Sequence, residues 1–365
     1  MKIYGFVAEF NPFHNGHKKF IDEVKRKYDP DVLIAIVSGN YVQRGDFSII
    51  DKWQKAELAV EMGVDLVVEL PFAYAVQPAD LFAKGSISLL KYLKINHLVF
   101  GTENELDFVE QAKRILELDG EFEANYSETY GSNLDNYLSS NGINSLNQPN
   151  QLLGVNYVME ILKNNFNIEI KTIHRNDNKY SATKIRNNLI TGKDSTELIP
   201  ILSSKQLNDP LSSWDKYFLY LKSRIVTNTA EENKQVYQVS EGLDNKFVKE
   251  IQNSNSWSEF LENVKSKRYT YARIRRLAIY MLLNVYPEEI ENVYNNPYIH
   301  ILGMNETGKN YLNSIREDVE IPVVPRIGKK EQTIMSLDIK VDRIIELIND
   351  RPQIYGKIPY MKGDK

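Results

Sequence analysis

No cysteine occurs among the 365 residues, which excludes disulfide bonds, thiolate metal sites and cysteine nucleophiles. Long apolar runs are also missing, since none approaches the roughly 18 residues that a membrane-spanning helix needs. The N-terminal segment MKIYGFVAE is too short to be a secretory signal, and its acidic residue comes too early for one. These absences predict a protein of the reducing cytoplasm that has no membrane segment.

An excess of either charge is missing too. The chain has 45 Lys and Arg against 49 Asp and Glu, a net charge of -4. This near balance excludes a protein that coats nucleic acid through bulk positive charge. Residues 1–200 carry 21 basic and 27 acidic side chains, whereas residues 201–365 carry 24 and 22. At about 150 residues per domain, the length predicts two or three domains.

Strand-like and helix-like segments alternate along the first third of the chain. The strand-like segments are residues 2–10, 31–38, 65–70 and 97–100, and helical spacing marks residues 17–28, 51–62 and 83–93. The apolar run VLIAIV at 32–37 is typical of a strand that is covered on both faces. Asp51 is a predicted N-cap and Gly63 a predicted stop. This alternation predicts an α/β fold with a Rossmann-like, doubly wound parallel sheet.

The rest of the chain changes character near residue 200. Residues 103–128 read as helix and 133–151 as a polar loop; a helix, strand and helix then follow at 153–164, 167–174 and from Ser181. Beyond the boundary the periodicity is helical at 214–227, 256–264, 273–285, 309–316 and 341–349. We therefore predict one domain over residues 1–200 and a mainly α-helical domain over residues 201–365.

The segment FNPFHNGH at residues 10–17 lies where the first strand turns into the first helix. Ligands bind at the carboxyl ends of parallel strands, and the free amides of a helix N-terminus attract anions. His14 and His17 lie on one face of that first turn, so both rings can reach the same phosphate group. Gly16 leaves room for a nucleotide near the backbone. Two surface histidines or a zinc site are the alternatives, but no third metal ligand has clear spacing.

A second segment fits the same site. His174 and Arg175 end a later strand, and YSATKIR at residues 180–186 opens the next helix. Ser181 can cap that helix, while Lys184 and Arg186 can hold pyrophosphate. Ordinary capping and a solvated helix face are the alternatives for these residues, and the histidine segment favours the phosphate interpretation.

These residues carry a family resemblance. HNGH at 14–17 resembles the HxGH signature of the nucleotidyltransferase superfamily, whose members attack the α-phosphate of ATP, and residues 181–186 resemble its second motif. A wider set of segments is similar to the bacterial tRNA(Met) cytidine acetate ligase family: AEFNPFHNGH (8–17), SGNYVQRGD (38–46), ELP (69–71), FGTEN (100–104), PNQLLG (149–154) and YIHILG (298–303). One departure is Gln151, where a second asparagine is expected after Asn150.

The resemblance implies a reaction in two steps. Acetate attacks ATP to give acetyl-adenylate and pyrophosphate, and the wobble cytidine of elongator tRNA(Met) then takes the acetyl group on its exocyclic amine to give N4-acetylcytidine. ATP and acetate are then substrates and Mg²⁺ is expected with ATP, while no membrane and no obligate protein partner are expected. Because the adenylate is the acyl donor, no covalent enzyme intermediate is needed, which agrees with the absence of cysteine.

The resemblance and the position along the chain together assign the site residues. The catalytic pair is His14 and His17, and the second-motif phosphate contacts are Ser181, Thr183 and Arg186. The ATP contacts are Val7, Ala8, Glu9, Phe10, Asn11, Pro12, Phe13, His14, Asn15, Gly16, His17, Lys18, Lys19, Phe20, Gly101, Asn150 and Arg175. No carboxylate cluster indicates a metal site; Asp46 and Glu9 are candidate helpers, and Arg44 is a candidate for the acetyl or cytidine side.

The segment KSKRYTYARIRR at residues 265–276 is the candidate RNA contact. Six of its residues are basic, none is acidic, and two tyrosines interleave. Cations neutralise phosphates while tyrosine stacks on unpaired bases, as an anticodon loop requires. The predicted tRNA contacts are Lys265, Lys267, Arg268, Arg273, Arg275 and Arg276. A solvated helix face is the alternative.

Two other functions compete with an RNA-modifying ligase. A small-molecule adenylyltransferase would share the nucleotide site, but it would not need the helical half with its basic segment. A non-catalytic RNA-binding or assembly factor would share the fold, and the intact His14, Gly16 and His17 argue against it.

Overall fold

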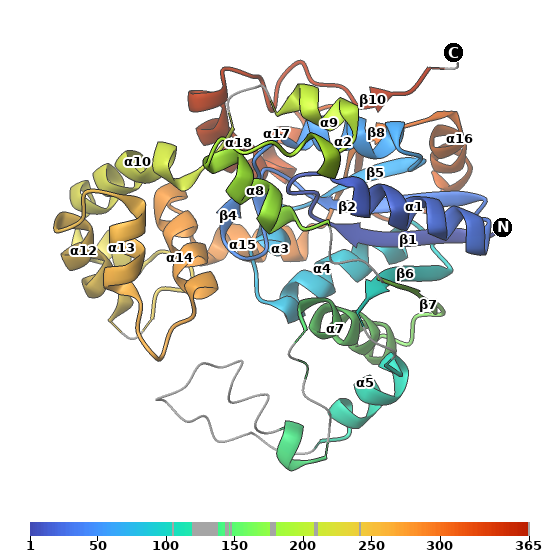
Figure 1. Ribbon diagram of the computed structural model, residues 1–365, viewed down its shortest axis with the longest axis horizontal. Coiled ribbons are helices and arrows are strands. Elements are labelled where there is room, and N and C mark those ends of the chain that lie inside the picture. Colours follow the sequence, from blue (N-terminus) through green and yellow to red (C-terminus); the bar gives the residue numbers. More distant parts are fainter. Residues whose placement is uncertain are drawn as a thin grey trace.

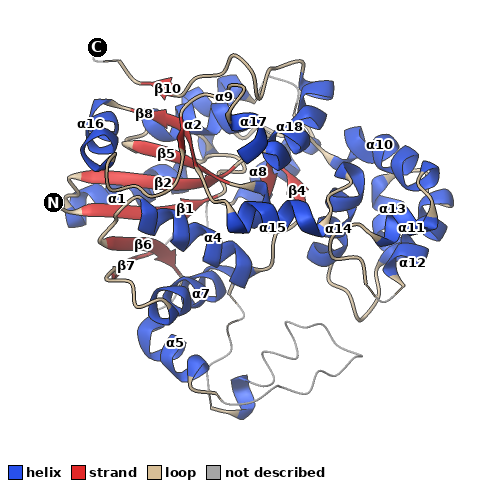
Figure 2. Cartoon of the chain, turned by 180° about the vertical axis from the view of Figure 1, so that it is seen from behind, coloured by secondary structure: helices blue, strands red, loops and turns tan. Residues whose placement is uncertain are grey.

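The computed structural model describes residues 1–103, 106–118, 138–142, 146, 148–175, 180–207, 211–240 and 242–363. In these residues eight strands form one sheet in the order β10-β8-β5-β2-β1-β6-β7, with β9 paired to β8 (Figure 2). The strands are β1 (Ile3–Ala8), β2 (Val32–Ser38), β5 (Leu66–Leu70), β6 (His97–Thr102), β7 (Glu169–His174), β8 (Ile299–Met304), β9 (Val323–Val324) and β10 (Tyr360–Met361). The predicted doubly wound α/β fold is confirmed.

The centre of the sheet is apolar on both faces. Every residue of β2 is buried, and β2 pairs in parallel with β1 on one side and with β5 on the other. Side chains of a strand alternate between faces, so a continuous apolar run requires cover on both faces. The helices of this part of the chain are α1 (Asn15–Tyr28), α2 (Lys52–Glu61), α3 (Phe72–Ala75), α4 (Ala79–Tyr92), α5 (Phe108–Leu116), α7 (Pro149–Lys163) and α8 (Ala182–Ile190). Of these, α2 and α4 contact both β2 and β5, and a later helix, α16 (Glu306–Ile315), also contacts β2.

Local sequence signals set the ends of these helices. The Asp51 side chain accepts hydrogen bonds from Trp53 N and Gln54 N, both at 2.9 Å, and α2 ends before Gly63, which has a φ of +110°. Both roles were predicted. The helix predicted over 103–128 is shorter in the structure: α5 spans Phe108–Leu116, residues 106–107 and 117–118 are not helical, and residues 104–105 and 119–128 lie outside the described residues. The loop predicted over 133–151 is wrong at its end, because α7 begins at Pro149, where proline suits the first turn of a helix; residues 133–137, 143–145 and 147 lie outside the described residues.

Helices dominate the next part of the chain. They are α9 (Ile201–Gln206), α10 (Trp214–Thr227), α11 (Ala230–Lys234), α12 (Leu243–Gln252), α13 (Trp257–Val264), α14 (Tyr271–Leu283) and α15 (Pro287–Asn295). α10, α12, α13 and α14 gather at one end of the molecule (Figure 1), where Trp214 stacks on Trp257 with ring centroids 3.9 Å apart. Within the described ranges, no helix is long and apolar enough to cross a membrane.

After these helices the chain returns to the sheet. β8 pairs antiparallel with β5, and α16 (Glu306–Ile315), α17 (Glu331–Ile334) and α18 (Ser336–Asn349) follow it. The sequence analysis predicted no strand in this region. β8 places residues 299–304 in the α/β sheet, and the division of the chain at residue 200 stays a prediction.

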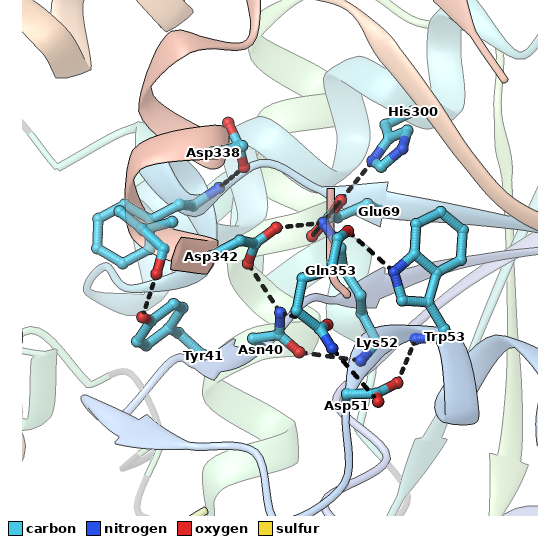
Figure 3. A network of polar contacts seen from close by, with 12 residues as sticks. Asn40, Tyr41, Asp51, Lys52, Trp53, Glu69, His300, Asp338, Asp342 and Gln353 are labelled. Atoms are coloured by element: carbon cyan, nitrogen blue, oxygen red, sulfur yellow. Dashed lines mark hydrogen bonds and ion pairs between the residues drawn. The ribbon is translucent and has the colours of Figure 1, made fainter. Parts of the chain in front are cut away.

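A buried ionic network holds α18 against the sheet (Figure 3). The fully buried Lys52 Nζ lies 2.9 Å from Glu69 Oε2 and 2.5 Å from Asp342 Oδ2. Burial lowers the pKa of Lys52, but the charges of Asp342 and Glu69 raise it above its ordinary value. His300 Nδ1 lies 2.5 Å from Glu69 Oε2, and Asn40 donates to Asp342 at 2.8 Å. The network joins α2, β5, β8 and α18.

Candidate active site

The predicted ATP contacts come from separate parts of the chain and meet at one edge of the sheet. Val7 and Ala8 end β1 and residues 9–14 follow it, Gly101 lies near the end of β6, and Arg175 follows β7. Since β1, β6 and β7 are parallel neighbours, their carboxyl ends lie on the same edge. The fold thus gathers these residues at the edge where α/β sheets bind ligands.

The two histidines cap α1 together. His14 is the N-cap residue, and its Nδ1 accepts a hydrogen bond from Gly16 N at 3.1 Å. His14 N in turn donates to His17 Nδ1 at 3.2 Å. The rings stack with their centroids 3.7 Å apart. The local sequence HNGH therefore forms a capping box in which imidazoles replace the usual hydroxyl and carboxylate.

These hydrogen bonds also set the protonation of both rings. A nitrogen that accepts a backbone N–H carries no proton, so a neutral ring has its proton on Nε2. Burial, together with the charge of Arg175, lowers the pKa of His14 to about 4. Burial, His14 and Arg175 hold the pKa of His17 well below its ordinary value. At neutral pH the pair presents two neutral Nε2–H donors, which suits hydrogen bonds to phosphate oxygens.

Gly16 is required by the ring of His14. A Cβ at this position would lie 2.9 Å from both Cε1 and Nδ1 of that ring, and 3.1 Å from Tyr180 Cβ. The sequence analysis assigned the glycine to nucleotide approach. The structure adds a reason within the protein, because any side chain at position 16 displaces the ring that caps the helix.

Arg175 lies next to the histidines and is positioned by Gly101. A Cβ on Gly101 would lie 2.9 Å from Arg175 Cδ, so the arginine stem crosses the space that the glycine leaves open. Arg175 N donates to Thr102 O at 2.8 Å, which continues the pairing of β6 with β7. Asn150, in the first turn of α7, donates through Nδ2 to Glu103 Oε1. The structure thus brings all three predicted residues to the strand ends.

The second motif docks onto the first through Arg186. Its Nη1 donates to Asn11 O at 2.6 Å and its Nη2 to Thr183 Oγ1 at 3.1 Å. Ser181 caps α8 by accepting from Lys184 N at 3.4 Å. Capping was the alternative explanation for Ser181, and it accounts for the contact that this side chain makes here. Arg186 ties the two motifs together.

The other predicted ATP contacts differ in what their side chains do. Phe10 and Phe13 are buried in the core, where both rings pack against His17 with centroid separations of 4.9 and 5.5 Å. Asn15 donates to Glu197 O, Lys18 pairs with Asp22, and Lys19 lies 4.6 Å above the Tyr180 ring. The Asn11–Pro12 peptide bond is cis.

Sequence reasoning missed Lys55, which lies fully buried under the end of β2. Its Nζ donates to Ser38 O and Gly39 O, both at 2.8 Å. Burial lowers the pKa of Lys55 to about 7, although the charges of Glu9, Glu69 and Asp51 oppose that shift. The available signal was its helical spacing, because it shares a face of α2 with apolar residues.

The basic segment 265–276 is divided between surface and core. Lys267 is exposed, and Lys265 lies 5.2 Å above the ring of the exposed Tyr271. The guanidinium carbons of Arg268 and Arg273 each lie 5.7 Å from the ring centroid of Tyr269, which is buried. Arg276 is also buried, with only 9% of its surface exposed. The predicted interleaved tyrosines therefore leave one ring for base stacking.

The described residues provide no cluster of three or more His, Asp or Glu side chains that could hold a metal ion. Glu9 Oε1 already accepts a hydrogen bond from Gln43 N at 2.7 Å. A resident Mg²⁺ site therefore does not fit the groups present in this part of the chain. Magnesium that arrives with nucleotide keeps water and phosphate ligands and needs few protein ligands.

Comparison with known proteins adds to this geometry. The family described as HIGH Nucleotidyl Transferase matches residues 1–357. The tRNA(Met) cytidine acetate ligase of Lactobacillus gasseri is 37% identical over 98% of this chain and 99% of that protein. The ligase of the same name from Listeria monocytogenes is 33% identical over 95% of both chains. The crystal structure of Thermotoga maritima TmcAL bound with alpha-thio ATP has a TM-score of 0.86, 30% identity and 99% coverage of both chains.

Proposed function

Because the chain belongs to the HIGH nucleotidyl transferase family and, within it, to the tRNA(Met) cytidine acetate ligases, we propose that it acetylates the wobble cytidine of elongator tRNA(Met). The substrates are ATP, acetate and the tRNA, and the products are N4-acetylcytidine, AMP and pyrophosphate. The observation that carries the proposal is the pair of neutral Nε2–H donors beside Arg175, at the edge of the sheet where nucleotides bind. Since its substrate is a tRNA, the protein acts in the cytoplasm.

The first step activates acetate. A carboxylate oxygen of acetate attacks the α-phosphorus of ATP, and pyrophosphate leaves. His14 and His17 donate to the phosphate oxygens that gain charge, and Arg175 binds the leaving pyrophosphate. Preorganised donors of this kind supply about 2.7–4 kcal/mol each. The backbone amides at the start of α1 add a fixed positive potential. Magnesium accompanies ATP as its counter-ion, and no step depends on a protein-bound metal.

The second step needs the tRNA to bring a base to the adenylate. The anticodon loop approaches along the basic segment 265–276, where Lys265, Lys267 and Arg268 offer cations near the exposed Tyr271. A base in a loop leaves its stack at little cost, so the cytidine enters the site without the unpairing of a duplex. α14 contacts the short strand β4 (Asp46–Phe47), and this contact supports an approach of the tRNA beside the nucleotide site.

One experiment tests the proposal against its alternatives. The protein is incubated with ATP, labelled acetate and bulk tRNA, and the digested tRNA is analysed for labelled N4-acetylcytidine. Label in that nucleoside supports the ligase. Adenylylation of nicotinamide mononucleotide or phosphopantetheine without labelled tRNA would instead identify a small-molecule adenylyltransferase, and ATP binding without any turnover would identify an assembly factor.

A single substitution at His17 tests the assignment of the active site. His17→Ala should abolish acetate-dependent exchange of pyrophosphate into ATP while tRNA still binds, because the change removes a donor at the phosphates and leaves the helical region intact. Exchange at the wild-type rate in this variant would remove His17 from the catalytic assignment.

A further inference from the structure

The short hairpin of β3 (Tyr41–Val42) and β4 (Asp46–Phe47) lies between the nucleotide site and the helical region. Figures 1 and 2 both show β4 between α8 and α14. Val42 pairs with Asp46 across the hairpin, and Gly45 makes the turn with a φ of +75°. The hairpin therefore lies where an acetyl-adenylate and an incoming base must meet, if the proposed function holds.

On one side, the hairpin is joined to the nucleotide loop. Asn11 Oδ1 accepts from Ile49 N at 2.9 Å, just after β4, and Glu9 Oε1 accepts from Gln43 N at 2.7 Å in the turn. Asn11 is also the residue whose carbonyl binds Arg186. The hairpin, the first motif and the second motif thus share hydrogen bonds and form one rigid unit.

On the other side, the hairpin packs directly on α14 and α10. A Cβ on Gly45 would lie 2.2 Å from Arg276 N, and Trp214 Nε1 donates to Gly45 O at 3.3 Å. Phe47 stacks on Tyr217 with ring centroids 4.0 Å apart. Since successive side chains of a strand point to opposite faces, Asp46 points away from α10.

Asp46 faces cations without forming an ion pair among the described residues, where its carboxylate accepts one hydrogen bond, from Phe47 N at 3.0 Å. The charged groups around it are Arg275 of α14, Arg186 of α8 and Glu9 after β1. Burial raises the pKa of the Asp46 carboxyl, and the two arginines oppose that shift. Arg275 Nε is buried and has no hydrogen-bond partner in the described part of the chain. Two half-buried groups, one carboxylate and one guanidinium, thus lie ready for a ligand.

We propose that Asp46 binds the exocyclic amine of the target cytidine and accepts its proton during acetyl transfer. The inference rests on the proposed function and adds the base that the second step requires. A carboxylate is the side chain that accepts hydrogen bonds from the N4 amine of cytosine. The rigid hairpin holds it between the nucleotide loop and the basic segment, which is where that amine must approach the adenylate.

The N4 nitrogen forms a bond to the carbonyl carbon of the acetyl group, and the bond between that carbon and the phosphate oxygen breaks. AMP leaves with the electron pair, and the proton lost by nitrogen passes to the Asp46 carboxylate and then to water. Arg186 and Arg275 favour the ionised carboxylate before the transfer, so the base is ready when the cytidine arrives.

Asp46→Asn separates the two half-reactions. Asparagine keeps the side-chain oxygen that accepts from Phe47 N and loses only the basic group. Acetate-dependent exchange of pyrophosphate into ATP, and trapping of the acetyl group by hydroxylamine, should stay within about twofold of wild type, while N4-acetylcytidine formation should fall by about 10²–10⁴. Glu23→Gln, on the exposed face of α1, is the matched control for loss of a carboxylate and should leave both steps unchanged.

The pH profile identifies a base rather than a structural group. In wild type, acetyl transfer should slow as the pH falls through the ionisation of Asp46, and this acidic limb should be absent in Asp46→Asn. Asp46→Glu, which keeps the charge, should restore part of the transfer rate. Equal loss of exchange and transfer in Asp46→Asn, or transfer at the wild-type rate, would overturn the inference. No exchange in the wild-type protein would instead overturn the proposed function.

Discussion

His14 and His17 stack with ring centroids 3.7 Å apart, and each accepts a backbone N–H through Nδ1. Two stacked imidazolium ions would repel each other, and protonation of Nδ1 would break the helix cap. The arrangement is therefore stable only while both rings are neutral. A motif that looks suited to cationic phosphate binding thus presents neutral hydrogen-bond donors.

The protonation state can be measured directly. Long-range ¹H–¹⁵N spectra of the histidine rings should show the Nε2–H tautomer for both residues at pH 7, and His14 should titrate near pH 4. In urea the same rings should titrate near the ordinary value of about 6.5. Between these two pH values the unfolded chain binds protons that the folded rings do not bind. The free energy of unfolding should therefore fall as the pH decreases from about 6.5 to 4. A folded-state midpoint near 6.5 would contradict the neutral pair.

Gly16→Ala tests the space under the His14 ring. The added methyl group would lie 2.9 Å from the ring, so the ring must move and the Nε2–H donor with it. We expect acetate-dependent pyrophosphate exchange to fall by about tenfold or more, since misplaced donors lose transition-state stabilisation. Thermal unfolding should change little, because alanine favours the helix by about 1 kcal/mol and offsets part of the clash. Gly363→Ala, which meets nothing within 4 Å, is the control.

The surface cations of segment 265–276 should set the salt dependence of tRNA binding. Each cation that neutralises a phosphate contributes about 0.7 to the slope of log K against log salt for single strands. Replacing Lys265, Lys267 and Arg268 with alanine should therefore lower that slope by about 2 and leave pyrophosphate exchange unchanged. Lys309→Ala, on α16 at the far end of the molecule from α13 (Figure 1), should leave the slope unchanged. An unchanged slope in the triple variant would refute the assignment.

Lys52→Met should destabilise the fold strongly. The change leaves Glu69 and Asp342 buried without their shared cation, and breaking a buried pair in this way costs about 3–5 kcal/mol. Urea unfolding followed by circular dichroism measures the loss. Lys309→Met removes a pair whose two side chains are about half exposed, and it should cost less than about 1 kcal/mol. Adding Glu69→Gln and Asp342→Asn to Lys52→Met should recover part of the stability; no recovery would show that charge is not the cause.

Local signals made much of the fold predictable. The run at 32–37 is a fully buried strand, Asp51 is a helix cap, and the HNGH segment forms the first turn of α1. For Asp51 and the HNGH segment the decisive contacts lie within a few residues along the chain, and for the strand a continuous apolar run is itself the signal of cover on both faces. The same holds for α10, whose predicted bounds match Trp214–Thr227.

Features that depend on distant contacts were not predictable in this way. β8 is a short apolar segment between helical ones, and periodicity alone cannot separate a short buried strand from a helix. The partners of Lys52 lie 17 and 290 residues away, and Asp46 faces Arg275 of a different region. Arg276 was assigned to RNA because its segment has no acidic residue and carries interleaved tyrosines, but the residue is buried where α14 packs against the hairpin.

The pairing of β8 with β5 also sets the order in which parts of the sheet can form during synthesis. His300 contacts Glu69 across 231 residues of chain, so β5 stays an open edge until that length has been translated. At about 5–20 residues per second this takes on the order of 10–50 s. The segments of the candidate nucleotide site, complete by Arg186, leave the ribosome well before β8, which pairs along the free side of β5. The nascent protein thus completes the segments of its candidate nucleotide site first, and the strand that pairs with β5 is added later.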